Sequence, residues 1–311
     1  MPFYIKQLDK KLSILAILHF MWGILISFRK DLATLWGLGV LFFGLLYVIR
    51  YKNRNDEASI FASYLVGMEV VLRGVGASVF WEYGKYSTIL ILLVGMIVEN
   101  VKFLRINTLS VIYFVSLLPA IALLPDAPFH ILRQMISANL SGPLCLFFSF
   151  LYFRRRMFNE INITNVFKSL MLPIISLIGL IYIRAPALQD VSFSSEANFD
   201  MSAGFGPNQV STVLGISLII VSLSRTFNLK IFPRSTYDYI FLSVSIGIAL
   251  LTFARGGVIA PLISITCSYF FASDIKYNTK VKGTFFIFMI FIGLYIVSSY
   301  FTEGMIDTRY A

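Results

Sequence analysis

The chain contains a series of apolar stretches, each free of charged side chains and about as long as one membrane crossing. A helix that crosses a hydrocarbon core about 30 Å thick needs about 20 apolar residues, and about 17 suffice when flanking side chains reach the headgroups. The clearest stretches, all bounded by charged residues, span 12–28, 32–49, 106–125, 134–153, 256–273 and 283–302. This pattern predicts a membrane protein that crosses the bilayer many times.

Shorter apolar stretches complete the pattern, and they span 86–98, 169–183, 210–224 and 239–254. A further helix begins near Ala58 and carries Glu69 and Arg73 in its second half. Together these segments predict an all-α polytopic integral membrane protein with about 11 transmembrane helices and its N-terminus inside. We expect residues 1–311 to form a single transmembrane helical domain, which would be the N-terminal part of a longer protein if the chain continues.

The composition excludes a water-soluble enzyme, because 58% of the residues are hydrophobic and only 14% are charged. The net charge of +10 could indicate nucleic-acid binding, and the distribution of Lys and Arg along the chain decides whether it does. With the N-terminus inside, most Lys and Arg residues fall on the inner side, as the positive-inside rule demands. We therefore expect no nucleic-acid partner, and we interpret the run 154–156 (Arg-Arg-Arg) as a topology anchor.

Neither metal nor thiol chemistry has a recognisable site in the sequence. Cys145 and Cys267 stand alone, and the two histidines, His19 and His130, form no ligand cluster with them, so we expect no metal and no cofactor. Ser141 lies near His130 in the sequence, but a nucleophilic serine needs a base on a facing element, so we do not expect these two residues to form a catalytic pair. No other residue is assigned as the catalytic base.

Arg255 is the strongest candidate for a functional residue, since ionisable groups at membrane depth cost about 2.5 to 3.5 kcal/mol each. It stands where the helix 239–254 gives way to the next one, with almost no polar linker. Gly256 and Gly257 follow, and we expect this turn to need the backbone freedom of glycine. The free N–H groups of the new helix beside a guanidinium predict an anion site. The alternative is an arginine that only reaches lipid phosphate.

Four further residues are candidates for substrate binding. Arg73 lies one helical turn after Glu69, so it either supports the site or forms a structural ion pair. Lys85 lies in the aromatic run 80–86 and could add positive charge at the outer surface. Arg184 ends a helix at the outer side, where reaching the headgroups is an equal explanation. Asn208 either caps the next helix or binds sugar hydroxyls.

Three short segments resemble the O-antigen ligase and O-antigen polymerase superfamily of bacterial envelope proteins. The strongest is 252–257 (Thr-Phe-Ala-Arg-Gly-Gly), which is similar to the family's helix-ending Ser-Arg-Gly signature, with Ala254 in place of the usual serine. The second is 206–209 (Gly-Pro-Asn-Gln), which opens a helix after an outer loop as the family's Pro-Asn does. The third consists of two pieces, 68–73 with Glu69 and Arg73 and the run 81–86 (Trp-Glu-Tyr-Gly-Lys-Tyr), which together resemble a subset of the family.

This resemblance implies a glycosyltransferase of the bacterial inner membrane that acts on the outer face and makes surface polysaccharide. It would transfer sugar chains from a polyprenyl diphosphate carrier, with Arg255 contacting the diphosphate and without a metal. The implied partners are the polyprenyl diphosphate-linked glycan, membrane lipid and other envelope polysaccharide assembly proteins.

The chain departs from the family's pattern near its C-terminus. Family members continue into a large outer loop that carries a further arginine and, in ligases, a histidine proposed as the base, and Arg309 is the one arginine here that could match.

A different class of function is the alternative to a glycosyltransferase. The chain would then be a transporter or flippase for an anionic or lipid-linked substrate.

Overall fold

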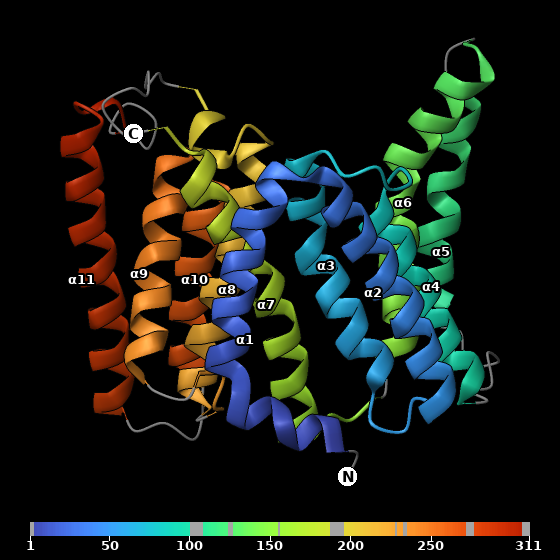
Figure 1. The fold of residues 1–311 in the computed structure, drawn as a ribbon, viewed down its shortest axis with the longest axis horizontal. Coiled ribbons are helices and arrows are strands. Elements are labelled where there is room, and N and C mark those ends of the chain that lie inside the picture. Colours follow the sequence, from blue (N-terminus) through green and yellow to red (C-terminus); the bar gives the residue numbers. More distant parts are fainter. Residues whose placement is uncertain are drawn as a thin grey trace. The chain divides into compact units, whose positions relative to one another are not determined.

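The computed structural model describes residues 3–99, 108–123, 127–154, 156–186, 196–227, 229–232, 235–271 and 277–306. Within these residues the chain forms eleven α-helices and no strand, which confirms the all-α class (Figure 1). The helices are α1 (Phe3–Phe28), α2 (Lys30–Tyr51), α3 (Glu57–Val75), α4 (Tyr83–Val98), α5 (Thr108–Leu117), α6 (Phe129–Phe153), α7 (Glu160–Arg184), α8 (Pro207–Thr226), α9 (Ser235–Leu251), α10 (Gly256–Phe271) and α11 (Tyr277–Phe301).

Six of the described helices are long and apolar enough to cross a membrane. They are α2, α3, α6, α7, α8 and, in α11, the segment Val281–Tyr300. Five further apolar segments, in α1, α4, α5, α9 and α10, have 10 to 17 residues. The structure is therefore that of a helical, multi-pass membrane protein.

One expected crossing is interrupted. The apolar stretch 106–125 forms only the ten-residue helix α5, which is followed by the 3-10 helix η2 (Leu118–Leu123). Pro119 lies in that second segment and has no N–H to donate to an α-helical bond, so α5 ends before it. In contrast, Pro143 and Pro173 are accommodated inside α6 and α7, as is common in membrane helices.

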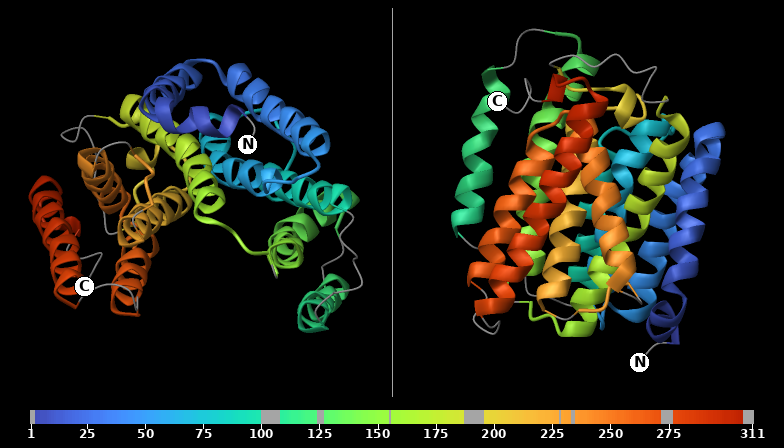
Figure 2. Two further views of the ribbon diagram at one scale, coloured as in Figure 1. Left: turned by 90° about the horizontal axis from the view of Figure 1, so that it is seen from below. Right: turned by 90° about the vertical axis from the view of Figure 1, so that its left-hand side faces the viewer.

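The chain divides into two compact units. Unit 1 comprises Met1–Lys30, Val70–Ala77 and Met171–Ala311, and unit 2 comprises Asp31–Glu69 and Ser78–Leu170. Unit 1 thus contains α1, the end of α3, most of α7 and the helices α8 to α11. Unit 2 contains α2, α4, α5, α6 and most of α3. In both, successive helices run up and down (Figure 2).

Glycines allow close helix contacts in unit 1. Gly23 of α1 lies against the backbone of Ser176, and Gly179 of α7 lies against the backbone of Phe20. A Cβ atom on Gly215 of α8 would stand only 2.6 Å from the carbonyl oxygen of Gly257 in α10. Small residues that let backbones approach closely are typical of helix packing in membranes.

Candidate functional site

The turn between α9 and α10 is buried and strained at a bulky residue. Phe253 is fully buried and has a φ of 57°, a conformation that is rare for any residue except glycine. Neither Gly256 nor Gly257 has a positive φ. The expectation that glycine's backbone freedom makes this turn is therefore wrong, because burial of the Phe253 ring holds the left-handed residue in place. Such strain concentrates at functional sites.

Arg255 ends this turn and immediately precedes α10. Its carbonyl oxygen accepts hydrogen bonds from the N–H groups of Val258 at 3.2 Å and Ile259 at 2.9 Å. Its side chain is exposed, and among the described residues its guanidinium has no hydrogen-bond or ion-pair partner. The positive end of the α10 dipole therefore carries an available planar cation.

The N-terminus of α8 lies beside that of α10. Ser211 donates a hydrogen bond from its hydroxyl to the carbonyl of Ala254 at 3.0 Å, and Gly257 packs directly against Ser211. Because Gly215 contacts Pro261 one turn further along both helices, α8 and α10 run in the same direction from one end (Figures 1 and 2). Two helix dipoles thus present their positive ends side by side.

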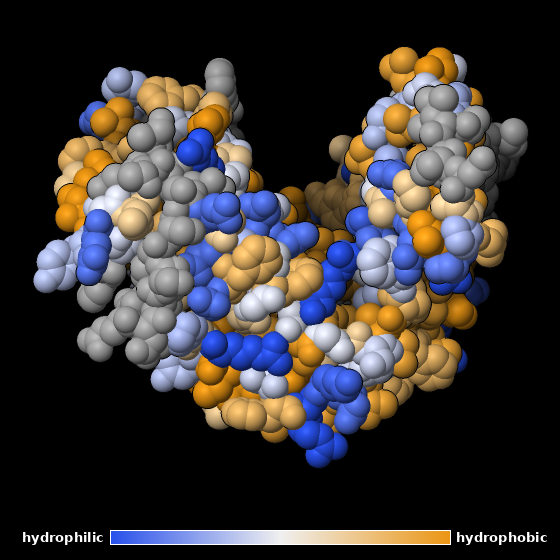
Figure 3. Space-filling model, turned by 90° about the horizontal axis from the view of Figure 1, so that it is seen from above, coloured by the Kyte–Doolittle hydropathy of each residue, from blue (hydrophilic) through white to orange (hydrophobic). Residues whose placement is uncertain are grey.

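Asn208 is exposed in the first turn of α8, but it is not the cap. The N-cap is Gly206, Pro207 occupies the first helical position, and no side chain caps the helix. The capping interpretation of Asn208 is therefore wrong, and its amide stays available at this end of unit 1. Figure 3 looks onto this end and shows hydrophilic residues lying among hydrophobic ones.

The two glycines after Arg255 have different environments. Gly256 is exposed, and a Cβ atom there would meet open space. Gly257 is buried, and a Cβ atom there would collide with the backbone and hydroxyl of Ser211. Only Gly256 can offer its N–H group to a ligand, while Gly257 serves the contact between α8 and α10.

The segment before α8 holds the turn from the other side. The N–H of Asn198 donates to the carbonyl of Thr252 at 2.9 Å, and the side-chain oxygen of Asn198 accepts from the N–H of Met201 at 3.1 Å. Asn198 is buried. The turn between α9 and α10 is therefore held by hydrogen bonds from both ends of the segment 198–211, from Asn198 to Thr252 and from Ser211 to Ala254.

Arg184 ties helix ends together in unit 1. Its guanidinium donates to the carbonyl of Gly74 at 2.7 Å, the carbonyl of Ser27 at 3.1 Å and the Ser27 hydroxyl at 3.2 Å. These carbonyls lie at the C-terminal ends of α3 and α1, where backbone oxygens lack helical partners and the dipole is negative. The contacts give Arg184 a structural role.

We expect Arg184→Met to lower the stability of unit 1 by about 2 kcal/mol, because two helix-end carbonyls lose charged donors. Thermal unfolding in detergent measures this change, with Arg133→Met as a control at an exposed arginine of unit 2. A variant with native stability but weakened ligand binding would instead support the substrate-binding interpretation.

The structure brings four sequence-predicted residues to one end of unit 1. A Cβ atom on Gly74 would lie 3.8 Å from the Cβ of Phe205, so the end of α3, with Arg73, is next to the start of α8. Arg184 binds that same end, while Asn208 and Arg255 begin the two parallel helices. Arg309 lies outside the described residues.

Lys85 belongs to unit 2 and is engaged there. Its ammonium lies 2.5 Å from a carboxylate oxygen of Glu82 and donates to the hydroxyl of Ser141 at 3.2 Å. Glu69, which also belongs to unit 2, packs against Gly84 in the same first turn of α4. This cluster of ionisable groups links α3, α4 and α6.

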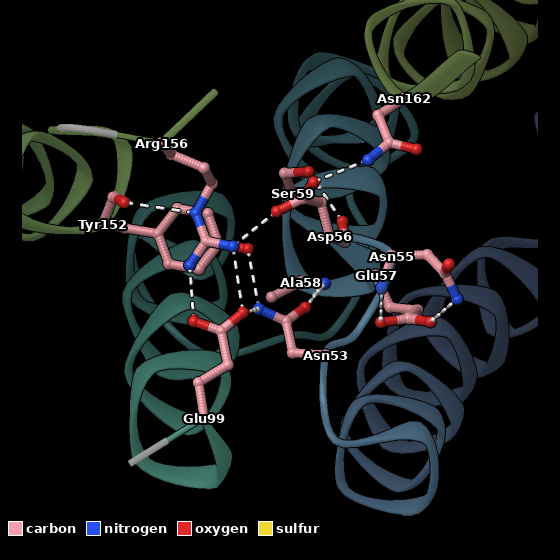
Figure 4. A network of polar contacts seen from close by, with 10 residues as sticks. All are labelled: Asn53, Asn55, Asp56, Glu57, Ala58, Ser59, Glu99, Tyr152, Arg156 and Asn162. Carbon is pink, nitrogen blue, oxygen red and sulfur yellow. Dashed lines mark hydrogen bonds and ion pairs between the residues drawn. The ribbon is translucent and has the colours of Figure 1, made fainter. Parts of the chain in front are cut away.

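A polar network around Arg156, which was not predicted from the sequence, lies at the end of unit 2 where α2, α4 and α6 end (Figure 4). Arg156 donates to both oxygens of Glu99 at 2.9 and 2.7 Å and pairs with Asp56, and its guanidinium stacks 3.9 Å over the Tyr152 ring. Asn53 donates to Glu99 at 2.6 Å. The run 154–156, whose Arg155 lies outside the described residues, is thus more than a topology anchor.

Burial alone would lower the pKa of Arg156, but the hydrogen bonds that it donates to Glu99 and Asp56 outweigh it and raise that pKa above its usual value. The signal in the sequence was the two acids, Asp56 and Glu99, placed at ends of apolar stretches that share one side of the membrane with 154–156.

The Arg156 network of unit 2 and the end of unit 1 around Arg255 differ in how far their charges are satisfied. The network of unit 2 is internally satisfied, with acids and base bonded to one another. The end of unit 1 around Arg255 presents an available cation and helix N-termini, which suit an anionic ligand. No protein-family model, no curated protein and no solved structure matches the chain.

Proposed function

We propose that the chain is a glycan polymerase or ligase of the O-antigen ligase and polymerase type in the bacterial inner membrane. It would cross the membrane about eleven times, with the N-terminus inside. It would transfer sugar chains from a polyprenyl diphosphate carrier on the outer face. The observation that carries this proposal is the exposed guanidinium of Arg255 at the joint N-terminal end of the parallel helices α8 and α10.

A diphosphate is the anion that this arrangement suits. In the transfer, an acceptor hydroxyl attacks the anomeric carbon, the bond from that carbon to the diphosphate oxygen breaks, and the hydroxyl proton passes to a base. Negative charge therefore grows on the departing diphosphate, where the Arg255 fork, the Gly256 N–H and two helix dipoles can stabilise it. The Asn208 amide, exposed in the first turn of α8, would bind sugar hydroxyls nearby.

The charge distribution supports an outward-facing site. Within unit 1, Arg225 ends α8 and Lys230 follows it, so both bases lie at the end opposite Arg255. The positive-inside rule places that basic end in the cytoplasm. The end with Arg255 would then face the compartment where lipid-linked glycans are assembled into surface polysaccharide.

A transporter or flippase is the second candidate, and the cluster of unit 2 favours it. Lys85 and Glu82 form an ion pair at the N-terminal end of α4, Lys85 also bonds Ser141 of α6, and ionisable groups buried between membrane helices commonly mark substrate or ion pathways. A vesicle assay with purified protein and a labelled lipid-linked substrate separates the two candidates. Movement of substrate across the bilayer would favour the transporter, and transfer without movement would favour the glycosyltransferase.

We expect Arg255→Ala to shorten surface-polysaccharide ladders in cells that depend on this protein. Loss of one charge-stabilising donor typically lowers the rate by about 100-fold to 1,000-fold. Arg255→Lys should retain part of the activity, because it keeps the charge but loses the planar fork. Ladders of unchanged length at normal expression of Arg255→Ala would remove this site from the mechanism.

A further inference from the structure

The turn between α2 and α3 separates its charges by sign. Its three bases, Arg50, Lys52 and Arg54, are exposed. Its two acids, Asp56 and Glu57, are buried. The eight-residue polar segment 50–57, which spans the end of α2, the turn and the start of α3, therefore shows a purely positive surface.

Contacts inside unit 2 explain why the acids point inward. Asp56 pairs with Arg156 and accepts a hydrogen bond from Asn162 at 2.7 Å, while Glu57 accepts bonds from the backbone and side chain of Asn55 at 3.1 and 3.0 Å. The acids are thus used within the fold. In contrast, the side chains of Arg50, Lys52 and Arg54 have no hydrogen-bond or ion-pair partner in the part of the chain that the structure describes.

Backbone strain keeps the two sets of side chains apart. Lys52, Asn53 and Asp56 all have left-handed conformations, with φ of 52°, 51° and 59°. Such residues are uncommon outside glycine and persist only when the surroundings hold them. Here the hydrogen bonds of Asn53 to Glu99 and Tyr152, at 2.6 and 2.9 Å, hold the turn.

The length of α2 places the bases at the depth of the lipid headgroups. This helix has 22 residues and qualifies as a membrane span that ends at Tyr51. The Tyr51 ring is 41% exposed and lies 4.3 Å from the ring of Tyr47, as in the aromatic belts at membrane surfaces. We therefore expect residues 50 to 54 to lie at the depth of the lipid phosphates.

We propose that Arg50, Lys52 and Arg54 form a binding surface for anionic phospholipid headgroups, such as phosphatidylglycerol. Three cations without protein partners would each attract an anionic lipid, and arginine can bind phosphate through two parallel hydrogen bonds. Arg156 serves this surface by withdrawing Asp56 from it, and Asn55 does the same for Glu57. The proposal concerns unit 2 alone and does not depend on the proposed glycan transfer.

Electron spin resonance of the purified chain in bilayers tests this inference. Spin-labelled phosphatidylglycerol and phosphatidylcholine report the relative association constant of the two lipids at the protein surface. We expect a preference for phosphatidylglycerol that falls by about fivefold for each cation removed in Arg50→Gln, Lys52→Gln and Arg54→Gln.

Two matched controls isolate the surface. The charge-retaining triple variant Arg50→Lys/Lys52→Arg/Arg54→Lys should keep the preference, and Arg133→Gln, which removes an exposed base at the other end of α6, should leave it unchanged. Thermal unfolding in pure phosphatidylcholine should be the same for the triple glutamine variant and the native chain. If that variant fails to fold, the single change Arg54→Gln carries the test.

Equal association of the two lipids with the native chain, or an unchanged preference in the folded glutamine variant, would overturn the proposal. Millimolar inorganic phosphate forms the second arm. A lipid surface should keep its preference in phosphate at constant ionic strength. Displacement of phosphatidylglycerol by phosphate would show a site for the free anion, and the proposal would then be wrong.

Discussion

Replacing Arg156 by methionine should destabilise unit 2 by about 3 to 5 kcal/mol, because removal of one member of a buried ion pair leaves the other charged and unpaired. The Arg156 and Glu99 side chains are only 15% and 19% exposed, and Asp56 is held on the same guanidinium. Without it, two carboxylates face each other across a poorly solvated space. Denaturation of the purified protein in detergent measures the loss.

The controls separate charge repulsion from a simple loss of contacts. Arg54→Met removes an exposed arginine from the neighbouring turn and should leave stability within about 0.5 kcal/mol of native. The triple variant Arg156→Met/Asp56→Asn/Glu99→Gln should recover part of the loss, because no unpaired charge remains. If Arg156→Met unfolds like the native chain, the network contributes nothing to the fold.

The positions of the helices could be predicted from the sequence because the bilayer acts on local composition. The stretch 32–49 lies within α2 and 134–153 lies within α6. The prediction for 106–125 missed the end of α5, because apolar composition alone does not indicate which proline ends an α-helix, as at Pro119, and which one is accommodated. The number of crossings follows from the same reasoning and stays a prediction.

The candidate site could be predicted only as far as its groups are neighbours in sequence. Arg255 at the start of α10 follows from a charged residue between two apolar stretches. The left-handed conformation of Phe253 depends on the burial of its ring, which no local pattern indicates. Arg184 bonds residues 157 and 110 positions away, so lipid contact and substrate binding were equal explanations of it at the level of the sequence.

The partners of Arg156 could not be predicted from the sequence either, because they too are distant along the chain. A run of three arginines after an apolar stretch is typical of a topology anchor, and this interpretation needs no partner. Its partners Asp56 and Glu99 are 100 and 57 positions away. Only the packing of α2, α4 and α6 in unit 2 reveals that the arginine is bound on several sides.

Two adjacent glycines at the start of α10 should respond in opposite ways to leucine. Gly257→Leu should destabilise unit 1 by about 3 kcal/mol or more, because overpacking against a backbone has no flexible neighbour to absorb it. Its Cβ would overlap the backbone of Ser211, so α10 must move away from α8 and the hydrogen bond from Ser211 to Ala254 must break. That bond fixes the residue next to Arg255, so the variant should also bind farnesyl diphosphate more weakly.

Gly256→Leu is the matched change, one position earlier in the same first turn. Its Cβ would meet open space and φ is not positive, so unfolding temperature should stay close to native. Measured together in detergent, the two variants distinguish a glycine required for helix packing from one required for the turn. Equal destabilisation by both would mean that the turn itself needs glycine, and the buried Phe253 would then not be enough to hold the turn that carries Arg255.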